Sequence, residues 1–489
     1  MKFAFISGTP PRDVKRMDAF WKGQQNLASF DENITDHVFT PVEGEEMFKL
    51  RTRASGHGFG SGNNCGEFCY NTHSVEVDGA LQWSWEVMRE CADNPLYPQG
   101  GTWIYDRAGW CPGAPVDTKE FELTPLVGGQ EAFAVDYDIT YDPDGNYRFE
   151  GQIVAYGAPN MQRDVEVSQI LAPSDDKIES RLNPVCKSPK VVIRNNGSEL
   201  LTSCSIVFGV QGGEMMTYNW EGALAFLESA EVELAYDDPI LWEGDDEEWL
   251  VFEVAVDAPN GAVDEEPRND RATSRFHRVP TWSYPDLDDN RVIVWTKTNA
   301  VPYETSVEIT DAVGNVVWER GYSTPNFTHR DTIALNQGCY RVTILDSGDD
   351  GQSFWANSDG SGYTRLKKVS GGNFINFEPD FGKSISQAFF LQTNVVSVTE
   401  TPAQNERSIT AFPNPSSGEI KLKMSGFIQG EQLSWSCLNL MGQELRSGSL
   451  RHARGQLGLL NLTSLPQGTY AIAVLDEFGN RWTEWIQIQ

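Results

Sequence analysis

Alternation of apolar and polar residues, with almost no helical periodicity, is the feature that most restricts the fold of this chain. In one clear case Phe133, Val135, Tyr137 and Ile139 alternate with small or polar residues, which is the period-two pattern of a half-buried strand. Turn residues follow at once in Asp142–Gly145, and similar short segments recur along the chain. Short strands with frequent turns are typical of β-sandwiches and jelly rolls, so the sequence predicts an all-β protein.

The chain has 489 residues, which is too long for one hydrophobic core, because single cores stop growing at about 250–300 residues. We expect a jelly-roll domain followed by two Ig-like β-sandwiches and a small C-terminal β-sandwich. The expected domains are 1–170, 173–280, 283–394 and 409–489, with a linker at 395–408. The linker is polar and rich in turn residues, as a flexible connection should be.

The chain is strongly acidic, with 38 basic and 70 acidic residues and a formal net charge of −32. Such a surface repels phosphate backbones, so we expect no nucleic-acid partner. We also expect no membrane span, because no segment is long and apolar enough. The apolar run at residues 3–6 is too short for a secretory signal. We therefore expect the natural start to lie further upstream.

The eight cysteines include three close pairs, which favours an oxidising compartment. The expected disulfides are Cys65–Cys69, Cys91–Cys111 and Cys186–Cys204. Closing the shortest loop yields only about 2 kcal/mol of chain entropy, but it would hold Glu67 in a fixed position. Zinc is the alternative, since Cys65, Cys69 and His73 recur every four residues; a closed zinc site would need a fourth ligand, which no nearby cysteine pair supplies. The state of Cys339 and Cys437 stays open.

Three motifs near the C-terminus have a characteristic order and spacing. They are Ala411–Gly418 (AFPNPSSG), Leu438–Leu445 (LNLMGQEL) and Leu465–Ile472 (LPQGTYAI). Together they resemble the type A sorting domain of the bacterial type IX secretion system, a small β-sandwich at the C-terminus of Bacteroidota cargo proteins. The resemblance implies export across the outer membrane, with the type IX machinery as a partner, and a secreted or surface-attached product.

The candidate functional site lies within residues 55–113. A Gly-rich segment at 55–60 (SGHGFG) precedes Cys65–His73 (CGEFCYNTH), and Asp106–Gly113 (DRAGWCPG) follows. These motifs resemble the second jelly roll of the peptide-N-glycosidase F family, over about residues 1–160. That family releases N-glycans by hydrolysing the bond between the asparagine side-chain amide and the first sugar. The resemblance implies an asparagine-glycan amidase-like hydrolase that acts on N-linked glycoproteins or glycopeptides.

The resemblance also implies roles for individual residues. Glu67 falls on a family active-site glutamate, and a carboxylate can orient water or the departing amide. Arg107 and Trp110 fall near the glycan-binding cleft, where a guanidinium can bind sugar or carbonyl oxygens and an indole can stack on a sugar. The family sequence Gly-Trp-Gly-His is replaced here by Gly-His-Gly-Phe, which makes His57 a substrate contact. His73 is the remaining candidate for substrate binding.

One departure from the family limits the expected activity. The family's principal catalytic aspartate lies in a first jelly roll with a Cys-Asp-Glu-Trp-Asp-type motif, and this sequence has no such motif. We therefore expect half of a two-domain active site, with weak or no activity of this chain alone. The alternative function is a non-catalytic glycan-binding or adhesive protein of the cell surface.

Each candidate residue also has a structural interpretation. Glu67 could be a solvated residue of a stapled loop, and Arg107 could form a structural ion pair with Asp106 or with Glu67. His73, beside an expected strand, could be a packed and hydrogen-bonded histidine. These alternatives place the same residues in the fold without giving them any chemistry.

We expect no cofactor and no metal in this site. The six histidines are not clustered as a copper site requires. Elsewhere, Asp346–Gly351 (DSGDDG) resembles part of a calcium loop, with oxygens at alternate positions and a glycine turn. The bidentate glutamate expected further along is missing. We therefore interpret this segment as an acidic turn that follows a strand at 340–345.

Overall fold

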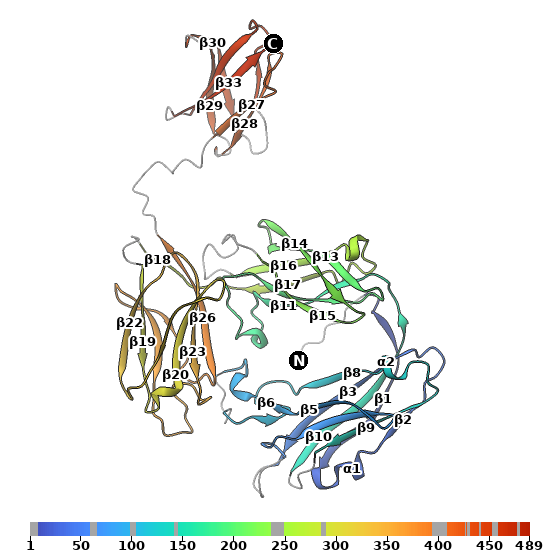
Figure 1. The fold of residues 1–489 in the computed structure, drawn as a ribbon. Helices are drawn as coiled ribbons and strands as arrows, with labels where there is room; N and C mark the ends of the chain where they lie inside the picture. Colours follow the sequence, from blue (N-terminus) through green and yellow to red (C-terminus); the bar gives the residue numbers. More distant parts are fainter. Residues whose placement is uncertain are drawn as a thin grey trace. The chain divides into compact units, whose positions relative to one another are not determined.

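The structure is a computed structural model that describes residues 8–58, 66–97, 104–140, 145–235, 249–284, 290–393, 408–425, 427, 431–439, 442–451, 458–476 and 480–489. The chain forms two compact units, 1–394 and 395–489. Nearly all regular elements are strands (Figure 1), which confirms the predicted all-β class. Cys65 and nearly all of the expected linker at 395–408 lie outside the described residues. Within the described ranges, no helix has the length and apolar character needed to cross a bilayer.

The first unit begins with a two-layer sandwich, here called the N-terminal sandwich. One sheet has the order β1 (Arg12–Asn26), β10 (Asn146–Pro159), β3 (Met47–His57) and β8 (Thr118–Glu122). The other sheet has the order β2 (His37–Phe39), β9 (Phe133–Ile139), β4 (Thr72–Val77) and β5 (Ala80–Glu86). The smaller elements are the paired strands β6 (Met88–Arg89) and β7 (Arg107–Ala108), the helices α1 (Phe30–Asn33) and α2 (Thr124–Val127), and the 3-10 turns η1 (Leu27–Ser29) and η2 (Cys91–Asp93).

Period-two alternation explains why these two sheets pack together. The apolar residues of β9 from Phe133 to Ile139 are buried, and the residues between them are partly exposed. Successive side chains of a strand point to opposite faces, so the apolar set meets the opposite sheet. Phe133 contacts Phe48 of β3 with ring centroids 5.4 Å apart, and Tyr137 contacts Phe149 of β10 at 4.4 Å. Burial of such large rings supplies most of the stabilisation, at roughly 25 cal/mol per Å² of apolar surface.

Two further sandwiches complete the first unit. The second sandwich has two sheets that share one core. The first has the order β11 (Val165–Ala172), β12 (Lys190–Asn195) and β15 (Ser229–Glu233). The second has the order β14 (Met215–Leu224), β13 (Leu201–Val210), β16 (Leu250–Asp257) and β17 (Arg271–Phe276). The third sandwich also has two sheets that share one core. The first has the order β18 (Thr281–Tyr284), β26 (Ser384–Thr393), β23 (Gly338–Asp346), β20 (Thr305–Asp311) and β21 (Val316–Gly321). The second has the order β22 (Thr328–Ala334), β19 (Arg291–Lys297), β24 (Tyr363–Lys368) and β25 (Asn373–Asn376). Their 3-10 turns are η3 (Lys177–Glu179), η5 (Pro259–Gly261) and η7 (Pro302–Glu304).

A disulfide joins the second and third sandwiches. Cys186 is bonded to Cys339, 153 residues later, and Cys204 is a free buried thiol. The expected Cys186–Cys204 bridge is therefore wrong. Cys204 occupies a buried position of β13 inside its own sandwich, whereas the sulfur of Cys186 lies 3.5 Å from the carbonyl oxygen of Phe389 in β26. Because β26 pairs with the strand that carries Cys339, the bridge crosses between sandwiches.

Arg181 links all three sandwiches of the first unit. It lies in the loop between β11 and β12, and its guanidinium donates hydrogen bonds to backbone carbonyls of both neighbouring sandwiches. The acceptors are the carbonyls of Ala92, Asn94, Phe381 and Ser384. A guanidinium has five N–H donors in a fixed plane, so it can hold several carbonyls at once. Burial lowers the pKa of Arg181 relative to its usual value.

The second unit is a smaller sandwich that contains all three C-terminal motifs. Its sheets have the orders β27 (Ser408–Phe412), β28 (Glu419–Ser425), β31 (Gly458–Asn461) and β30 (Glu444–Arg451), β29 (Gln432–Leu438), β32 (Gly468–Leu475), β33 (Arg481–Ile488). Asn414 of the first motif donates to the carbonyl of Trp485 and accepts from the amide of Gln487, which ties the motif to β33. Tyr470 of the third motif donates its hydroxyl hydrogen bond to the carbonyl of Pro466 at 2.7 Å. The motifs therefore fix turns at the ends of this sandwich.

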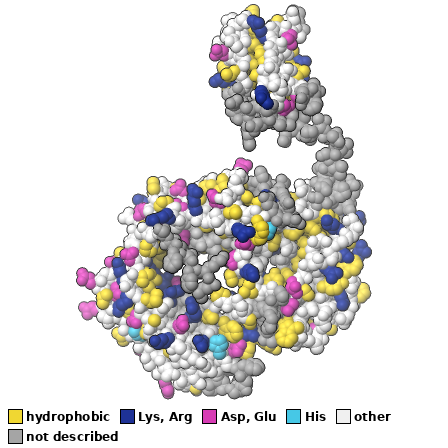
Figure 2. All heavy atoms as spheres, turned by 180° about the vertical axis from the view of Figure 1, so that it is seen from behind, with side chains coloured by type: hydrophobic (Ala, Val, Ile, Leu, Met, Phe, Trp, Pro, Cys, Tyr) yellow, Lys and Arg dark blue, Asp and Glu magenta, His cyan; other side chains and the backbone are white. Residues whose placement is uncertain are grey.

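Charged side chains are spread over the surface. On the face drawn in Figure 2, acidic and basic side chains are interspersed and do not form a single large patch. The 70 acidic residues outnumber the 38 basic ones, and charges that are interspersed in this way keep a surface solvated.

Candidate functional site

The backbone around Glu67 is packed so closely that glycines are required. A Cβ at Gly66 would lie 2.0 Å from the carbonyl oxygen of His57, and one at Gly56 would lie 1.7 Å from the carbonyl oxygen of Gly66. A Cβ at Gly145, the residue directly before β10, would lie 2.2 Å from the Cα of Gly66. The loop that carries Glu67 therefore lies directly against the ends of β3 and β10. Glycine permits this approach because it has no side chain.

Glu67 and Arg107 form an ion pair. Nε of Arg107 lies 3.1 Å from Oε1 of Glu67, and the two side chains are 6% and 15% exposed. The backbone also joins these segments, because the amide of Ala108 donates to the carbonyl of Glu67 at 2.9 Å. Arg107 further donates to the carbonyl of Tyr105 at 3.0 Å. Glu67 is thus held at two points by strand β7, and part of its side chain remains accessible.

Aromatic residues surround this ion pair. The guanidinium carbon of Arg107 lies 5.4 Å from the ring of Phe68 and 5.3 Å from the ring of Trp110, within the range of cation–π attraction. Trp110 donates its indole hydrogen bond to the carbonyl of Gly56 at 2.9 Å. Tyr105 packs edge-on against Phe68 and is 53% exposed. Exposed aromatic rings of this kind can stack on sugar faces.

His57 lies beside the same group of residues, as the resemblance implied. Its ring centroid is 5.5 Å from that of Trp110, and its Nε2 is 3.0 Å from the hydroxyl oxygen of Ser55. Burial lowers the pKa of His57, with a smaller opposing effect from the carboxylate of Glu67 and a further lowering from Arg148. The imidazole therefore favours its neutral form, in which it can both donate and accept hydrogen bonds.

Disulfides brace both segments of the site. Cys91 is bonded to Cys111, as predicted, with Cα atoms 5.4 Å apart. Cys69 is also disulfide-bonded, and its expected partner Cys65 lies outside the described residues. The carboxylate of Asp106 also accepts a hydrogen bond from the backbone amide of Cys91 at 3.2 Å. These links hold the turn before β7 in place.

His73 lies in the core of the sandwich, which contradicts its expected role in substrate binding. It occupies β4 and has 0% exposure. Its Nδ1 is 2.5 Å from the hydroxyl oxygen of Tyr137, and burial lowers its pKa to about 3. The placement agrees with the structural alternative of a packed histidine. It also removes the zinc alternative, because Cys69 is disulfide-bonded and His73 points into the core.

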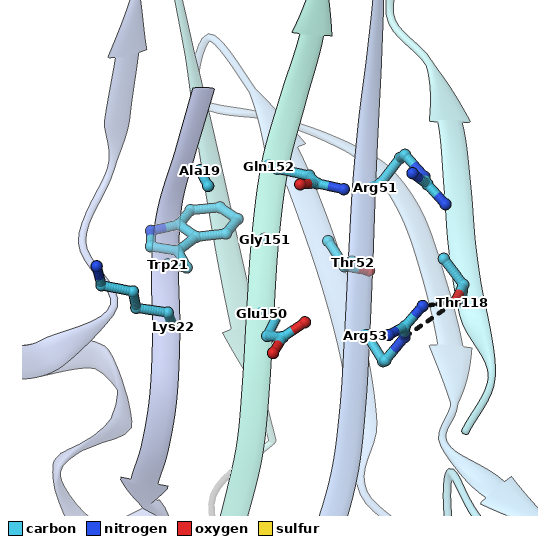
Figure 3. Close-up of a pocket in the computed structure, with 10 residues that line it drawn as sticks. All are labelled: Ala19, Trp21, Lys22, Arg51, Thr52, Arg53, Thr118, Glu150, Gly151 and Gln152. Carbon is cyan, nitrogen blue, oxygen red and sulfur yellow. Dashed lines mark hydrogen bonds between the residues drawn. The ribbon is translucent and has the colours of Figure 1, made fainter. Parts of the chain in front are cut away.

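A separate hollow of about 270 Å³ lies on the sheet of β1, β10, β3 and β8. Figure 3 shows Trp21 beside Gly151 and Arg53 reaching Thr118. A Cβ at Gly151 would lie 2.3 Å from the ring of Trp21, so this glycine makes room for the indole. The lining includes Glu150 but none of the predicted site residues. The hollow is therefore distinct from the surroundings of Glu67.

The structure thus brings four of the five predicted site residues together and separates one. Glu67, Arg107, Trp110 and His57 are neighbours, and His73 is not accessible. The sequence analysis missed the aromatic residues Phe68 and Tyr105, although both lie within or next to the motifs that identified the site. Phe68 directly follows Glu67, and Tyr105 lies two residues before Arg107. This proximity in sequence was the signal that could have identified both rings as part of the site. A partly accessible carboxylate among aromatic rings can bind polar groups of a sugar or an amide.

Comparisons with known proteins match two parts of the chain. The family described as Peptide-N-glycosidase F, C terminal matches residues 27–165, and the secretion system C-terminal sorting domain matches residues 410–489. The peptide-N(4)-(N-acetyl-beta-D-glucosaminyl)asparagine amidase F of Elizabethkingia miricola is 31% identical over 151 residues, or 28% of this chain and 42% of that protein. The chain therefore spans less than half the length of this curated relative.

Solved structures give similar partial matches. PNGase F, a glycosylasparaginase from Flavobacterium meningosepticum, is 25% identical, with 30% of this chain and 53% of that chain covered and a TM-score of 0.24. PNGF-II is 16% identical, with 29% and 30% covered and a TM-score of 0.23. The sorting domain indicates type IX secretion to the cell surface or the extracellular space. The chain thus combines a region that matches the peptide-N-glycosidase F C-terminal family, residues 27–165, with a secretion-system sorting domain, residues 410–489.

Proposed function

We propose that the N-terminal sandwich contributes the Glu67 side of an active site that hydrolyses the asparagine–glycan amide bond of secreted or surface-exposed N-glycoproteins. One observation carries the proposal. The carboxylate of Glu67, at the position of a family active-site glutamate, is held by the 3.1 Å ion pair with Arg107, and the Glu67 side chain remains 15% exposed. A group that orients water or the departing amide must be fixed in this way and still be reachable.

The residues around Glu67 have different parts in this proposal. Arg107 is a positioning residue, because its side chain is only 6% exposed and is bonded to Glu67. Tyr105 offers an accessible ring for the first sugars, and Trp110 forms part of the wall behind it. His57, with its pKa lowered by burial, donates or accepts a hydrogen bond at the sugar hydroxyls. The remaining acid of the reaction would come from a second domain, as the family resemblance implies.

The alternative function is non-catalytic glycan binding at the cell surface. The same ion pair favours it, because an arginine bonded to the carboxylate competes with water for one of its oxygens. In that case Glu67 would accept hydrogen bonds from sugar hydroxyls, and the aromatic rings would supply the stacking.

A release assay separates the two functions. A defined N-glycopeptide is incubated with this chain and, where the gene encodes residues before Met1, with the extended protein. The amidase function predicts conversion of glycosylated asparagine to aspartate by the extended protein, and a loss of about 100-fold or more in Glu67→Gln. Carbohydrate-array binding without any product would support the binding function. Unchanged release by Glu67→Gln would show that this carboxylate has no catalytic part.

The conservative variant Trp83→Phe serves as a matched control. Trp83 lies in β5 and packs on Phe121 with ring centroids 4.8 Å apart. It should leave both release and glycan binding unchanged, whereas Tyr105→Ala should weaken glycan binding in either function.

A further inference from the structure

Three carboxylates gather at one end of the third sandwich, and none of them belongs to the candidate site of the N-terminal sandwich. One oxygen each of Glu304, Asp346 and Asp350 lies within 4.8 Å of the others. Glu304 ends the 3-10 turn η7, Asp346 ends β23, and Asp350 lies in the loop that follows. The cluster therefore combines two segments that are separated by about forty residues of sequence.

Two of the three carboxylates are buried without a full set of partners. Asp346 is 2% exposed and Asp350 is 7% exposed. Among the described residues, Oδ2 of Asp346 and Oδ1 of Asp350 have no hydrogen-bond partner. The other oxygens are used: Oδ1 of Asp346 accepts from the amides of Gly348 and Asp350, and Oδ2 of Asp350 accepts from the amide group of Asn357 at 2.6 Å. Such unsatisfied buried acceptors are rare in folded proteins and point to a missing ligand.

The loop is shaped to bring these acids together. A Cβ at Gly348 would lie 2.9 Å from Oε2 of Glu304 and 3.2 Å from Oδ1 of Asp346, so glycine allows the two carboxylates to approach the loop closely. The amide of Ser347 also donates to the carbonyl of Glu304 at 3.0 Å, which fixes the turn η7 against the loop.

Three carboxylates this close together, two of them buried, repel one another when they are ionised. Burial, together with the carboxylates of Asp350 and Glu304, raises the pKa of Asp346 to about 8. Burial and repulsion from Glu304 and Asp359 together raise the pKa of Asp350 to about 6. Like charges in a buried site are tolerated when a cation or protons balance them.

We propose that Glu304, Asp346 and Asp350 bind a calcium ion. Oxygens that surround one calcium ion at about 2.4 Å are at most about 4.8 Å apart, which matches the observed cluster. The donors are all hard oxygens, which excludes a preference for zinc or copper. Calcium tolerates irregular geometry and accepts waters and backbone oxygens for the remaining positions, whereas magnesium demands a near-octahedral set. Glu304 is only partly buried, so the ion can enter past it.

This site differs from the acidic turn that the sequence predicted. The sequence argument required a glutamate further along the loop. The structure instead supplies Glu304 from a turn that precedes the loop in the chain. A second acidic group, Asp164, Asp264 and Asp270, lies in the second sandwich. There, Asp164 and Asp264 share a side-chain hydrogen bond and Asn269 donates to both oxygens of Asp164, so protons and amides satisfy these two carboxylates. Among the described residues, Oδ1 of Asp270 has no hydrogen-bond partner, so this cluster has one such carboxylate where the first has two.

Calcium titration of the full chain tests the proposal. Chelator-treated protein is titrated with Ca²⁺ by calorimetry, and its melting temperature is recorded with and without Ca²⁺. We expect binding with Kd on the order of 0.1–1 mM, as in extracellular calcium modules, and a rise in melting temperature, because a ligand that binds only the folded state stabilises it. Mg²⁺ at the same concentration should bind at least about 10-fold more weakly.

The variants Asp346→Asn and Glu304→Gln should each weaken Ca²⁺ binding at least about 10-fold and abolish the calcium-dependent rise in melting temperature. Glu304 is partly exposed, so Glu304→Gln remains informative even where Asp346→Asn fails to fold. Glu319→Gln is the matched control, because Glu319 lies exposed on β21 of the same sandwich and its loss should change neither value. The proposal is overturned by wild-type protein that shows no Ca²⁺ binding, or by Glu304→Gln that binds Ca²⁺ as wild type does. Its outcome does not depend on glycan release.

Discussion

Arg107 and Glu67 form a largely buried ion pair that joins strand β7 to the loop bearing the candidate catalytic acid. The Arg107–Glu67 contact is 3.1 Å long. Arg89 lies opposite Arg107 in the β6–β7 ribbon and forms a more exposed ion pair with Asp117, also at 3.1 Å. The two arginines differ mainly in exposure, with side chains 6% and 25% exposed. Comparing the stability of variants at the two arginines therefore shows how burial changes the contribution of an ion pair.

Arg107→Ala should lower the free energy of unfolding by about 3 kcal/mol or more, because it leaves the carboxylate of Glu67 without its partner in a poorly solvated position. Arg89→Ala should cost about 1 kcal/mol or less, since exposed ion pairs contribute little. Urea unfolding followed by tryptophan fluorescence measures both. Equal losses in the two variants would contradict the view that Arg107 fixes Glu67.

The buried imidazole of His73 should make the N-terminal sandwich sensitive to acid. Burial lowers its pKa from 6.5 to about 3, so the folded state takes up fewer protons than the unfolded state between these values. The contribution of His73 to stability is therefore present above pH 6.5 and is lost as the pH falls toward about 3. His73→Gln should flatten the decline of stability over this range. The partly exposed His37 provides the control, and His37→Gln should leave the wild-type decline in place.

The Cys186–Cys339 bridge should stabilise the pairing of the second and third sandwiches. Closing a loop of 153 residues restricts the unfolded chain by up to about 5 kcal/mol in the chain-entropy model. Cys339→Ser should therefore lower the melting temperature under non-reducing conditions. Cys204→Ala, which removes a free buried thiol, should have a smaller effect. Peptide mapping without reduction provides the direct check, and a peptide pair linking Cys186 to Cys204 would refute the connectivity.

Arg181 should be needed for the contact between the three sandwiches of the first unit. Arg181→Lys keeps the charge but replaces a planar fork of donors with one ammonium group, which cannot reach all of the carbonyls that the guanidinium holds. Hydrogen exchange should increase in the segments Ala92–Asn94 and Phe381–Ser384. Arg163→Lys is the control, because the ion pairs that Arg163 forms with described residues are long contacts of 3.8 and 3.9 Å with surface glutamates. Unchanged protection in Arg181→Lys would show that other contacts carry the junction.

The sequence by itself determined the all-β class, the two family matches and the neighbourhood of the site. Period-two alternation reveals which face of a strand is buried, as in β9, because side chains alternate strictly along a strand. The resemblance of the local motifs to the peptide-N-glycosidase F family predicted that Glu67, Arg107 and Trp110 belong to one site, and the structure places them close together. The expected domain boundaries stay a prediction.

Only the tertiary structure decided the partners of residues that are distant in the chain. Spacing suggested Cys204 as the partner of Cys186, but the structure joins Cys186 to Cys339 and leaves Cys204 as a free buried thiol. His73 lies in a site motif, yet the alternation of β4 turns its ring inward. Glu304 completes an acid cluster that the loop sequence left incomplete. In each case the deciding contact joins separate strands or turns, and such contacts depend on how sheets pack, which local sequence patterns do not encode.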